Sequence, residues 1–273
     1  MSNHAKRVHH YHAGAIALGG SLEHPFKRNV AAQAPMNLSA VGGYASARAE
    51  KFEFEGIASF HSALTQVAGT HDEKTGGWST LSSARVEGLN ILNVVTADRV
   101  VTQITTEHPA VGYVPRVNFH GTQFHNLRVN GRPVEIDLDL DICSHEKELE
   151  YPAEPCTRRK GFLEKVDERF HHMKKSKEIP EWLKERYKWD NARAQHEATG
   201  SILCSLVKGF RGDVPAGCYG HAIDLPGFGR IFIAELLVDH NSYRLSMLRL
   251  ELGCPVHGML SIADTNNNGS THP

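Results

Sequence analysis

Alternation of apolar and polar residues is the dominant pattern of this 273-residue chain. Over residues 134–141 every second residue is apolar and the others are acidic, which is typical of a strand with one buried face. The Asn130-Gly131 dipeptide before it favours a two-residue type I′ turn, and residues 124–129 supply a partner strand. We therefore predict a β-hairpin over about residues 117–141.

Further strands are predicted on both sides of this hairpin. Turn-forming residues separate them at intervals of about 8–15 residues, as in all-β sandwiches and barrels. Small residues fill the first two candidates, which indicates close packing of one face against a neighbour. The predicted strands cover residues 11–18, 44–54, 57–69, 78–87, 94–106, 201–207, 217–225, 230–238, 244–252 and 256–263.

One segment has helical periodicity instead. Its apolar residues recur every three to four positions, at Phe162, Val166, Phe170 and Met173. This spacing predicts an amphipathic helix over residues 161–175. Pro180 suits a first helical turn and opens a second predicted helix over residues 181–188.

These elements predict one mainly β domain over residues 1–273. We expect an antiparallel β-sandwich or barrel with a helical insertion at about residues 157–190. The insertion holds 11 of the 30 basic residues and two of the three tryptophans. A solvated helix face is favoured over a surface for an acidic partner or a membrane, because seven acidic residues are interleaved there. Its aromatic residues are expected to pack beneath it.

Charge and hydropathy exclude several classes of protein. The 30 basic and 31 acidic side chains argue against a dedicated nucleic-acid-binding protein. The sequence has no run of about 18 apolar residues, so no transmembrane segment is predicted. Residues 13–18 are too short for the core of a signal peptide. We expect a cytoplasmic location, with export or surface display as the alternative.

The five cysteines form no Cys-x-x-Cys pair, which excludes a zinc ribbon and a thioredoxin-type motif. Cys143 and Cys156 flank a polar loop and would form a disulfide in an oxidising compartment. Buried or idle thiols are favoured for these two and for Cys204, Cys218 and Cys254.

Histidine is unusually frequent, with 18 residues, and is the main hint of chemistry. The P-loop, GxSxG, GxGxxG and HExxH motifs are all absent from the sequence. If the protein holds a divalent metal, we expect the ligands His120, His125 and His221, with Glu235 as a fourth group. Neutral imidazoles with an open position suit Zn²⁺, Fe²⁺ or Cu²⁺. No other cofactor is expected, and no catalytic residue is predicted.

Three other candidate metal sites have simpler interpretations. His10 and His12 would share one strand face, but a flexible, solvated chain end is favoured for the first twelve residues. The acidic residues of 135–141 would suit Ca²⁺, but alternation alone predicts a solvated face. Residues 264–269 copy the first half of a calcium loop, and a disordered polar tail is favoured there.

Three segments carry a resemblance to a known family. Residues 84–104 read Ala-Arg-Val-Glu-Gly-Leu-Asn-Ile-Leu-Asn-Val-Val-Thr-Ala-Asp-Arg-Val-Val-Thr-Gln-Ile, and residues 124–131 read Phe-His-Asn-Leu-Arg-Val-Asn-Gly. Both resemble the bacterial choice-of-anchor P proteins, and residues 231–258 are loosely similar. The resemblance covers about half the chain and implies an all-β fold linked with export and surface display, without an activity. The sequence departs from the family pattern in two ways. It shows neither the leader nor the sorting tail of these proteins, and its helical insertion lies outside their pattern.

Two functions follow from these observations. The first is a non-catalytic β-sandwich protein that binds a protein partner or self-assembles as a homo-oligomer, because the recognisable patterns are architectural. The alternative is a metal-dependent enzyme on a β-scaffold with histidine ligands. Convergence of the histidines on one cavity would discriminate between them.

Overall fold

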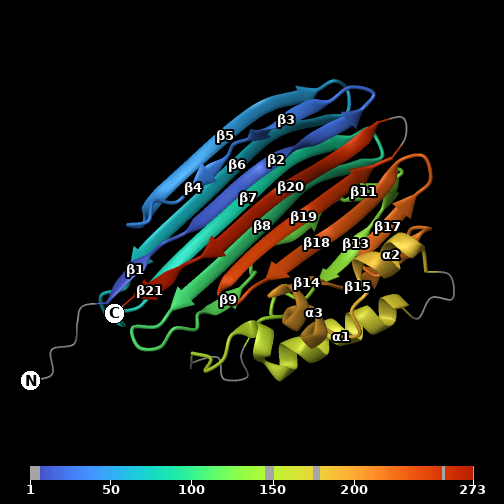
Figure 1. Cartoon of the computed structure of the whole chain (residues 1–273). Coiled ribbons are helices and arrows are strands. Elements are labelled where there is room, and N and C mark those ends of the chain that lie inside the picture. Colours follow the sequence, from blue (N-terminus) through green and yellow to red (C-terminus); the bar gives the residue numbers. More distant parts are fainter. Residues whose placement is uncertain (1–6, 145–150, 175–178, 254–255, 273) are drawn as a thin grey trace, which may run out of the picture.

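The protein folds into two large antiparallel sheets that face each other (Figure 1). The computed structural model describes residues 7–144, 151–174, 179–253 and 256–272, so Cys254, Lys175 and Lys177 lie outside the described residues. Strands β2 and β20 of one sheet lie against β6, β7 and β8 of the other. The predicted mainly β fold is therefore confirmed, as a sandwich with a helical insertion. None of the described helices is long and apolar enough to cross a membrane.

The first sheet has eight strands in the order β12-β11-β8-β7-β6-β5, with β9 and β10 also paired to β8. Its long strands match the predicted ones closely. The strands are β5 (Gly43–Phe54), β6 (Ala58–His71), β7 (Trp78–Ile91), β8 (Val95–His108), β9 (Arg116–Asn118), β10 (Gln123–His125), β11 (Arg128–Val129) and β12 (Arg132–Pro133).

The second sheet has nine strands in the order β16-β17-β18-β19-β20-β2-β3, with β14 paired to β18 and β4 to β2. Its strands are β2 (Ala13–His24), β3 (Arg28–Gln33), β4 (Met36–Asn37), β14 (Ile202–Ser205), β16 (Cys218–Tyr219), β17 (Ala222–Leu225), β18 (Gly229–Val238), β19 (Ser242–Leu252) and β20 (His257–Asn268). Two short pairs complete the fold: β1 (Val8–His10) with β21 (Ser270–His272), and β13 (Glu135–Leu138) with β15 (Val207–Arg211).

The helices lie together along one side of the sandwich, beside β13, β14 and β15 (Figure 1). They are the 3₁₀ helix η1 (Cys156–Arg158), α1 (Lys160–Lys174), α2 (Glu181–Arg186) and α3 (Ala192–Thr199). The first two α-helices were predicted, and the apolar face of α1 is buried as expected. Helix α3 was not predicted, although the Asn191 side chain caps its first turn and Gly200 ends it with a φ of 78°.

The predicted hairpin over residues 117–141 is shorter in the structure. Strands β11 and β12 pair across the Asn130-Gly131 turn, and the last bond runs from the Val134 N–H to the Leu127 carbonyl. Strand β13 then leaves this partner and pairs with β15. The acidic side chains of this segment bind basic groups, and Asp139 lies 2.6 Å from Arg169 Nη2. The expectation of a merely solvated acidic face is therefore wrong at this position.

Both chain ends are more ordered than predicted. Strand β20 continues through Asn267, whose buried amide donates hydrogen bonds to the Thr80 and Ile104 carbonyls of the opposite sheet. The predicted disordered tail over residues 264–269 is therefore wrong, because residues 264–268 belong to β20 and Asn267 joins the two sheets. The expectation of a solvated N-terminal end also fails for His9, which is buried in β1.

Each large sheet is crossed by a line of residues that interrupts the regular pairing. Between β18 and β19 the pairing passes from Ile233–Leu248 to Glu235–Ser246. Ala234 and Met247 are thus left unpaired between these two pairs. The neighbouring strands also leave one residue unpaired at the same level, so the line in the second sheet runs through Ala234, Met247, Ala263 and Ala17. We call this line of four residues the crease. Ala234 and Ala263 have left-handed φ angles of 48° and 51°.

The first sheet carries a corresponding line. It runs through Lys51, His61, Gly88 and Asp98. Gly88 has a φ of 65°, and a Cβ atom there would lie 2.3 Å from His61 Nδ1. Any other residue would have a strained backbone at this φ and would displace the His61 ring, so glycine is favoured here.

Candidate functional site

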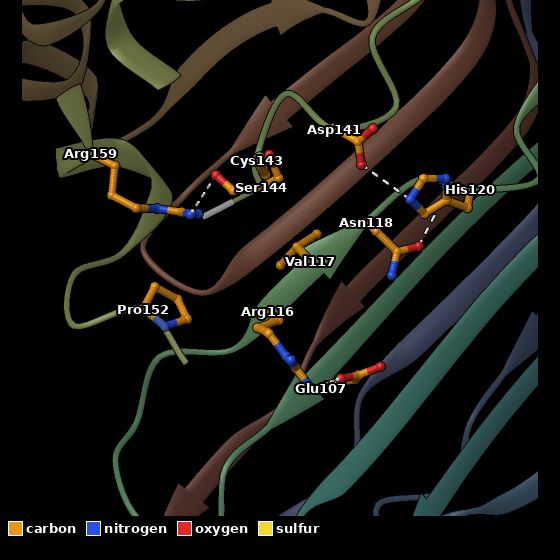
Figure 2. Close-up of a pocket in the computed structure, with 10 residues that line it drawn as sticks. All are labelled: Glu107, Arg116, Val117, Asn118, His120, Asp141, Cys143, Ser144, Pro152 and Arg159. Carbon is orange, nitrogen blue, oxygen red and sulfur yellow. Dashed lines mark hydrogen bonds and ion pairs between the residues drawn. The ribbon is translucent and has the colours of Figure 1, made fainter. Parts of the chain in front are cut away.

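A cavity of about 270 Å³ opens where β9 meets the residues around η1 (Figure 2). The sandwich supplies one wall and the start of the helical insertion supplies the other. The lining residues are Glu107, Arg116, Val117, Asn118, His120, Asp141, Cys143, Ser144, Pro152 and Arg159. We call this cavity the junction pocket.

Most charged side chains of the junction pocket are matched by an opposite charge. Arg116 Nη2 lies 2.6 Å from Glu107 Oε2, and His120 Nε2 lies 3.1 Å from Asp141 Oδ1. Arg159 differs, because its Nη1 donates to a neutral acceptor, the Ser144 carbonyl, at 3.2 Å. In the part of the chain that the structure describes, its Nε and Nη2 atoms are buried without a hydrogen-bond partner. The pocket therefore carries one positive charge without a described counter-charge.

The thiol at this pocket is not activated. Cys143 is buried, and its Sγ atom lies 2.8 Å from the Sγ of Cys156. Burial and the hydrogen bond from Cys156 raise the pKa of Cys143 well above its ordinary value. The thiol therefore stays protonated at neutral pH and is a poor nucleophile.

A second group of polar residues lies buried between α2 and the second sheet. It contains two of the sequence-predicted residues, His221 and Glu235, whose Nε2 and Oε1 atoms are 3.8 Å apart. Tyr187, directly after α2, connects them: its hydroxyl donates to Glu235 Oε1 at 3.1 Å and lies 2.6 Å from His221 Nε2. With its proton donated to Glu235, the hydroxyl oxygen accepts from His221 in the tautomer that carries a proton on Nε2.

Two arginines complete this buried group. Arg186 Nη2 lies 2.5 Å from Glu235 Oε1, and Arg249 Nε lies 3.1 Å from Oε2. Burial raises the pKa of Glu235, but its interactions with His221 and the two arginines outweigh this and hold the pKa at about 2. Burial and the Glu235 charge raise the pKa of Tyr187. At neutral pH the carboxylate is ionised and the phenol is neutral, so neither is poised to exchange a proton.

The crease explains how Glu235 reaches this group. The guanidinium of Arg186 binds Glu235 and also stacks over the Phe232 ring, 4.2 Å from its centroid. Residues 232 and 235 would point to opposite faces in a regular strand. Ala234, in the left-handed region between them, places both side chains under α2.

Acid should weaken the protein through Glu235. Its carboxyl takes up a proton near the ordinary value of 4.5 in the unfolded chain, but only near 2 in the native protein. The stabilisation is therefore complete above pH 4.5 and is lost as pH falls towards 2, by roughly 3 kcal/mol in total. Urea unfolding above, within and below this window should show the wild-type protein approaching the stability of Glu235→Gln. A constant difference between the two proteins would contradict this assignment.

The four sequence-predicted metal ligands have other partners in the structure. His120 binds Asp141, and His125 Nε2 lies 2.9 Å from Arg99 Nη2. The arginines around Glu235 would repel a cation there. Among the described residues, no three His, Cys, Asp or Glu side chains form a group that could hold a metal ion. Metal binding by His120, His125, His221 and Glu235 stays a prediction without a described common site.

Sequence reasoning missed the arginines of both groups. Arg159 belongs to a basic run that was interpreted as a solvated helix face, and Arg249 lies on a strand with few visible signals. The placement of Tyr187 was foreseen, since the aromatic residues of the insertion were expected to pack beneath it. Its ring is indeed buried.

The fold and the junction pocket define a two-sheet β-sandwich protein with a helical insertion and a small polar cavity at their junction. The chain belongs to a family described as a domain of unknown function (DUF8256), whose model matches residues 9–239. No curated protein and no solved structure matches the chain. The resemblance to choice-of-anchor P proteins stays a prediction, since the family description does not mention them.

Proposed function

We propose that this protein is a non-catalytic binding protein that holds a carboxylate group of its partner in the junction pocket. The unmatched charge of Arg159 carries this proposal. A half-buried guanidinium with two buried nitrogen atoms and no described hydrogen-bond partner for them is unfavourable, and a carboxylate is the group that its planar fork binds best. An incoming acidic group would therefore complete the pocket.

The size of the pocket supports a small group as its occupant. A volume of about 270 Å³ is below the range of about 300–1,000 Å³ that is usual for drug-sized ligands. One acidic side chain or a chain end fits better than an extended substrate. The carboxylate belongs to another protein or to a second copy of this chain. Sedimentation velocity of the purified protein distinguishes these two sources.

The titratable groups support a non-catalytic role. Catalytic acids and bases are tuned towards the working pH. Burial raises the pKa of Cys143, and the pKa of Glu235 is held at about 2. His120 is oriented by Asp141, but in the described part of the chain its side chain has no hydrogen bond to a serine or cysteine. No observation on the described residues favours the metal-dependent enzyme over the binding protein.

Arg159→Leu should weaken carboxylate binding about ten- to a hundredfold, because a hydrogen bond to a charged group is worth about 1.5–3 kcal/mol. Succinate is the probe, and its dissociation constant is measured from chemical-shift changes in ¹⁵N–¹H spectra. Arg48→Leu is the matched control, since it removes the same charge from an exposed strand. Equal affinity in both variants, or wild-type shifts that do not saturate, would overturn the proposal.

A further inference from the structure

A pair of buried histidines lies at the end of the sandwich where β1 pairs with β21 (Figure 1). His9 is on β1 and His108 ends β8, and their ring centroids are 4.6 Å apart. Trp78 stacks on His9 at 5.3 Å, and Tyr11 contacts it edge-on at 4.6 Å. His9 therefore packs against three aromatic rings, one of which is His108.

The ring nitrogens of this pair are largely unpartnered. His9 is 6% exposed and His108 is 1% exposed. His9 Nδ1 lies 3.0 Å from Thr271 Oγ1. Among the residues that the structure describes, His9 Nε2 and both nitrogens of His108 have no hydrogen-bond partner. Buried polar atoms rarely lack a hydrogen-bond partner, so we expect a ligand to bind these nitrogen atoms.

The two Nε2 atoms without a described partner lie close to the same point beside Gly269. A Cβ atom at this residue would lie 2.8 Å from His9 Nε2 and 3.0 Å from His108 Nε2. Glycine has no Cβ atom to fill this point, and one nitrogen from each of two strands lies within 3.0 Å of it. The hydrogen bond between His9 Nδ1 and Thr271 orients the ring, as a hydrogen bond at the other ring nitrogen commonly does for metal-binding histidines.

We propose that His9 and His108 form a two-coordinate site for Cu(I). Copper accepts imidazole ligands, and its monovalent ion is stable with two nitrogens in a line. Zinc would need about four ligands, and calcium or magnesium would need oxygen atoms. The described ring contacts of the pair are with neutral side chains, so a single positive charge is easier to bury there than a double one.

The protonation state of the pair is compatible with this role. Burial, together with the neighbouring His10, lowers the pKa of His9 to about 4. Burial and the proximity of His9 lower the pKa of His108 to about 3. Both imidazoles are therefore neutral at pH 7, and each has a lone pair available.

The test is an anaerobic titration of the full-length, tag-free protein with Cu(I) in competition with bicinchoninate. We expect one equivalent to bind with quenching of Trp78 fluorescence, because this ring stacks on His9. His108→Ala should lower the affinity by at least about a hundredfold, since one of two ligands is lost. His10→Ala is the matched control, because this histidine is exposed on the same strand and should leave the binding unchanged.

A third variant keeps both ligands. Gly269→Ala places a methyl group between the two Nε2 atoms, and it should lower the affinity about tenfold or more even if His108→Ala fails to fold. The absorption edge of the bound copper should show two-coordinate Cu(I). Weak binding by the wild type, equal losses in His10→Ala and His108→Ala, or full affinity in Gly269→Ala would each overturn the proposal.

Discussion

Glu235→Gln should lower the free energy of unfolding by about 3–5 kcal/mol, the largest effect that we expect of a single polar substitution in this protein. The carboxylate is 5% exposed and compensates the charges of Arg186 and Arg249. Glutamine keeps the shape but leaves both guanidinium groups without this partner. Urea unfolding monitored by circular dichroism measures the loss, and hydrogen exchange should show α2 losing protection first.

Glu251→Gln is the matched control for this experiment. Glu251 contacts the same arginines, at 2.7 Å from Arg249 and 3.8 Å from Arg186, but its side chain is 32% exposed. Solvent screens this carboxylate, so its loss should cost no more than about 1 kcal/mol. Similar losses in the two variants would show that burial of Glu235 is not what anchors the helical insertion.

Oxidation should join Cys143 and Cys156 and raise the free energy of unfolding by about 3 kcal/mol. Their sulfur atoms are already 2.8 Å apart, so little rearrangement is needed. The two thiols lose two protons and two electrons, and oxidised glutathione is reduced to two glutathione molecules. Burial raises the pKa of Cys143, so the reaction should be slow at neutral pH and faster in alkali. Thiol titration and unfolding curves before and after oxidation measure both effects.

Cys156→Ala provides the control, because it leaves Cys143 without its neighbour. The oxidant should then produce neither the loss of two thiols nor the gain in stability. Retention of both thiols in the oxidised wild-type protein would contradict the prediction. The bond would tie residue 143, which lines the junction pocket, to the first residue of η1.

Regular periodicity made much of the fold predictable. The strands of the first sheet and the helix over residues 161–175 follow from side chains that alternate or recur at a fixed spacing, and each buries one face. The strand over residues 230–238 is a continuous apolar run, and it is buried on both faces. The prediction failed where polar residues are buried, as at Asn267, because its bonds to the opposite sheet depend on a tertiary contact.

The candidate sites were less predictable for the same reason. His221 and Glu235 were chosen, and the structure does bring them together, but the arginines beside them make the group an anchor for α2. The left-handed residue Ala234, which aims Glu235, has no sequence signal, since alanine rarely adopts this conformation. His9 was set aside because chain ends are usually disordered, whereas the β1–β21 pair holds it in place.

The crease also constrains how the sequence of this family can change length. Ala17, Ala263, Met247 and Ala234 occupy the same level in four neighbouring strands, so each strand carries its irregular residue in step with the next. Deleting Ala234 alone would leave the rest of β18 one residue out of register with β19. Insertions and deletions should therefore be confined to loops in related sequences, and any length change at this level should occur in all four strands together.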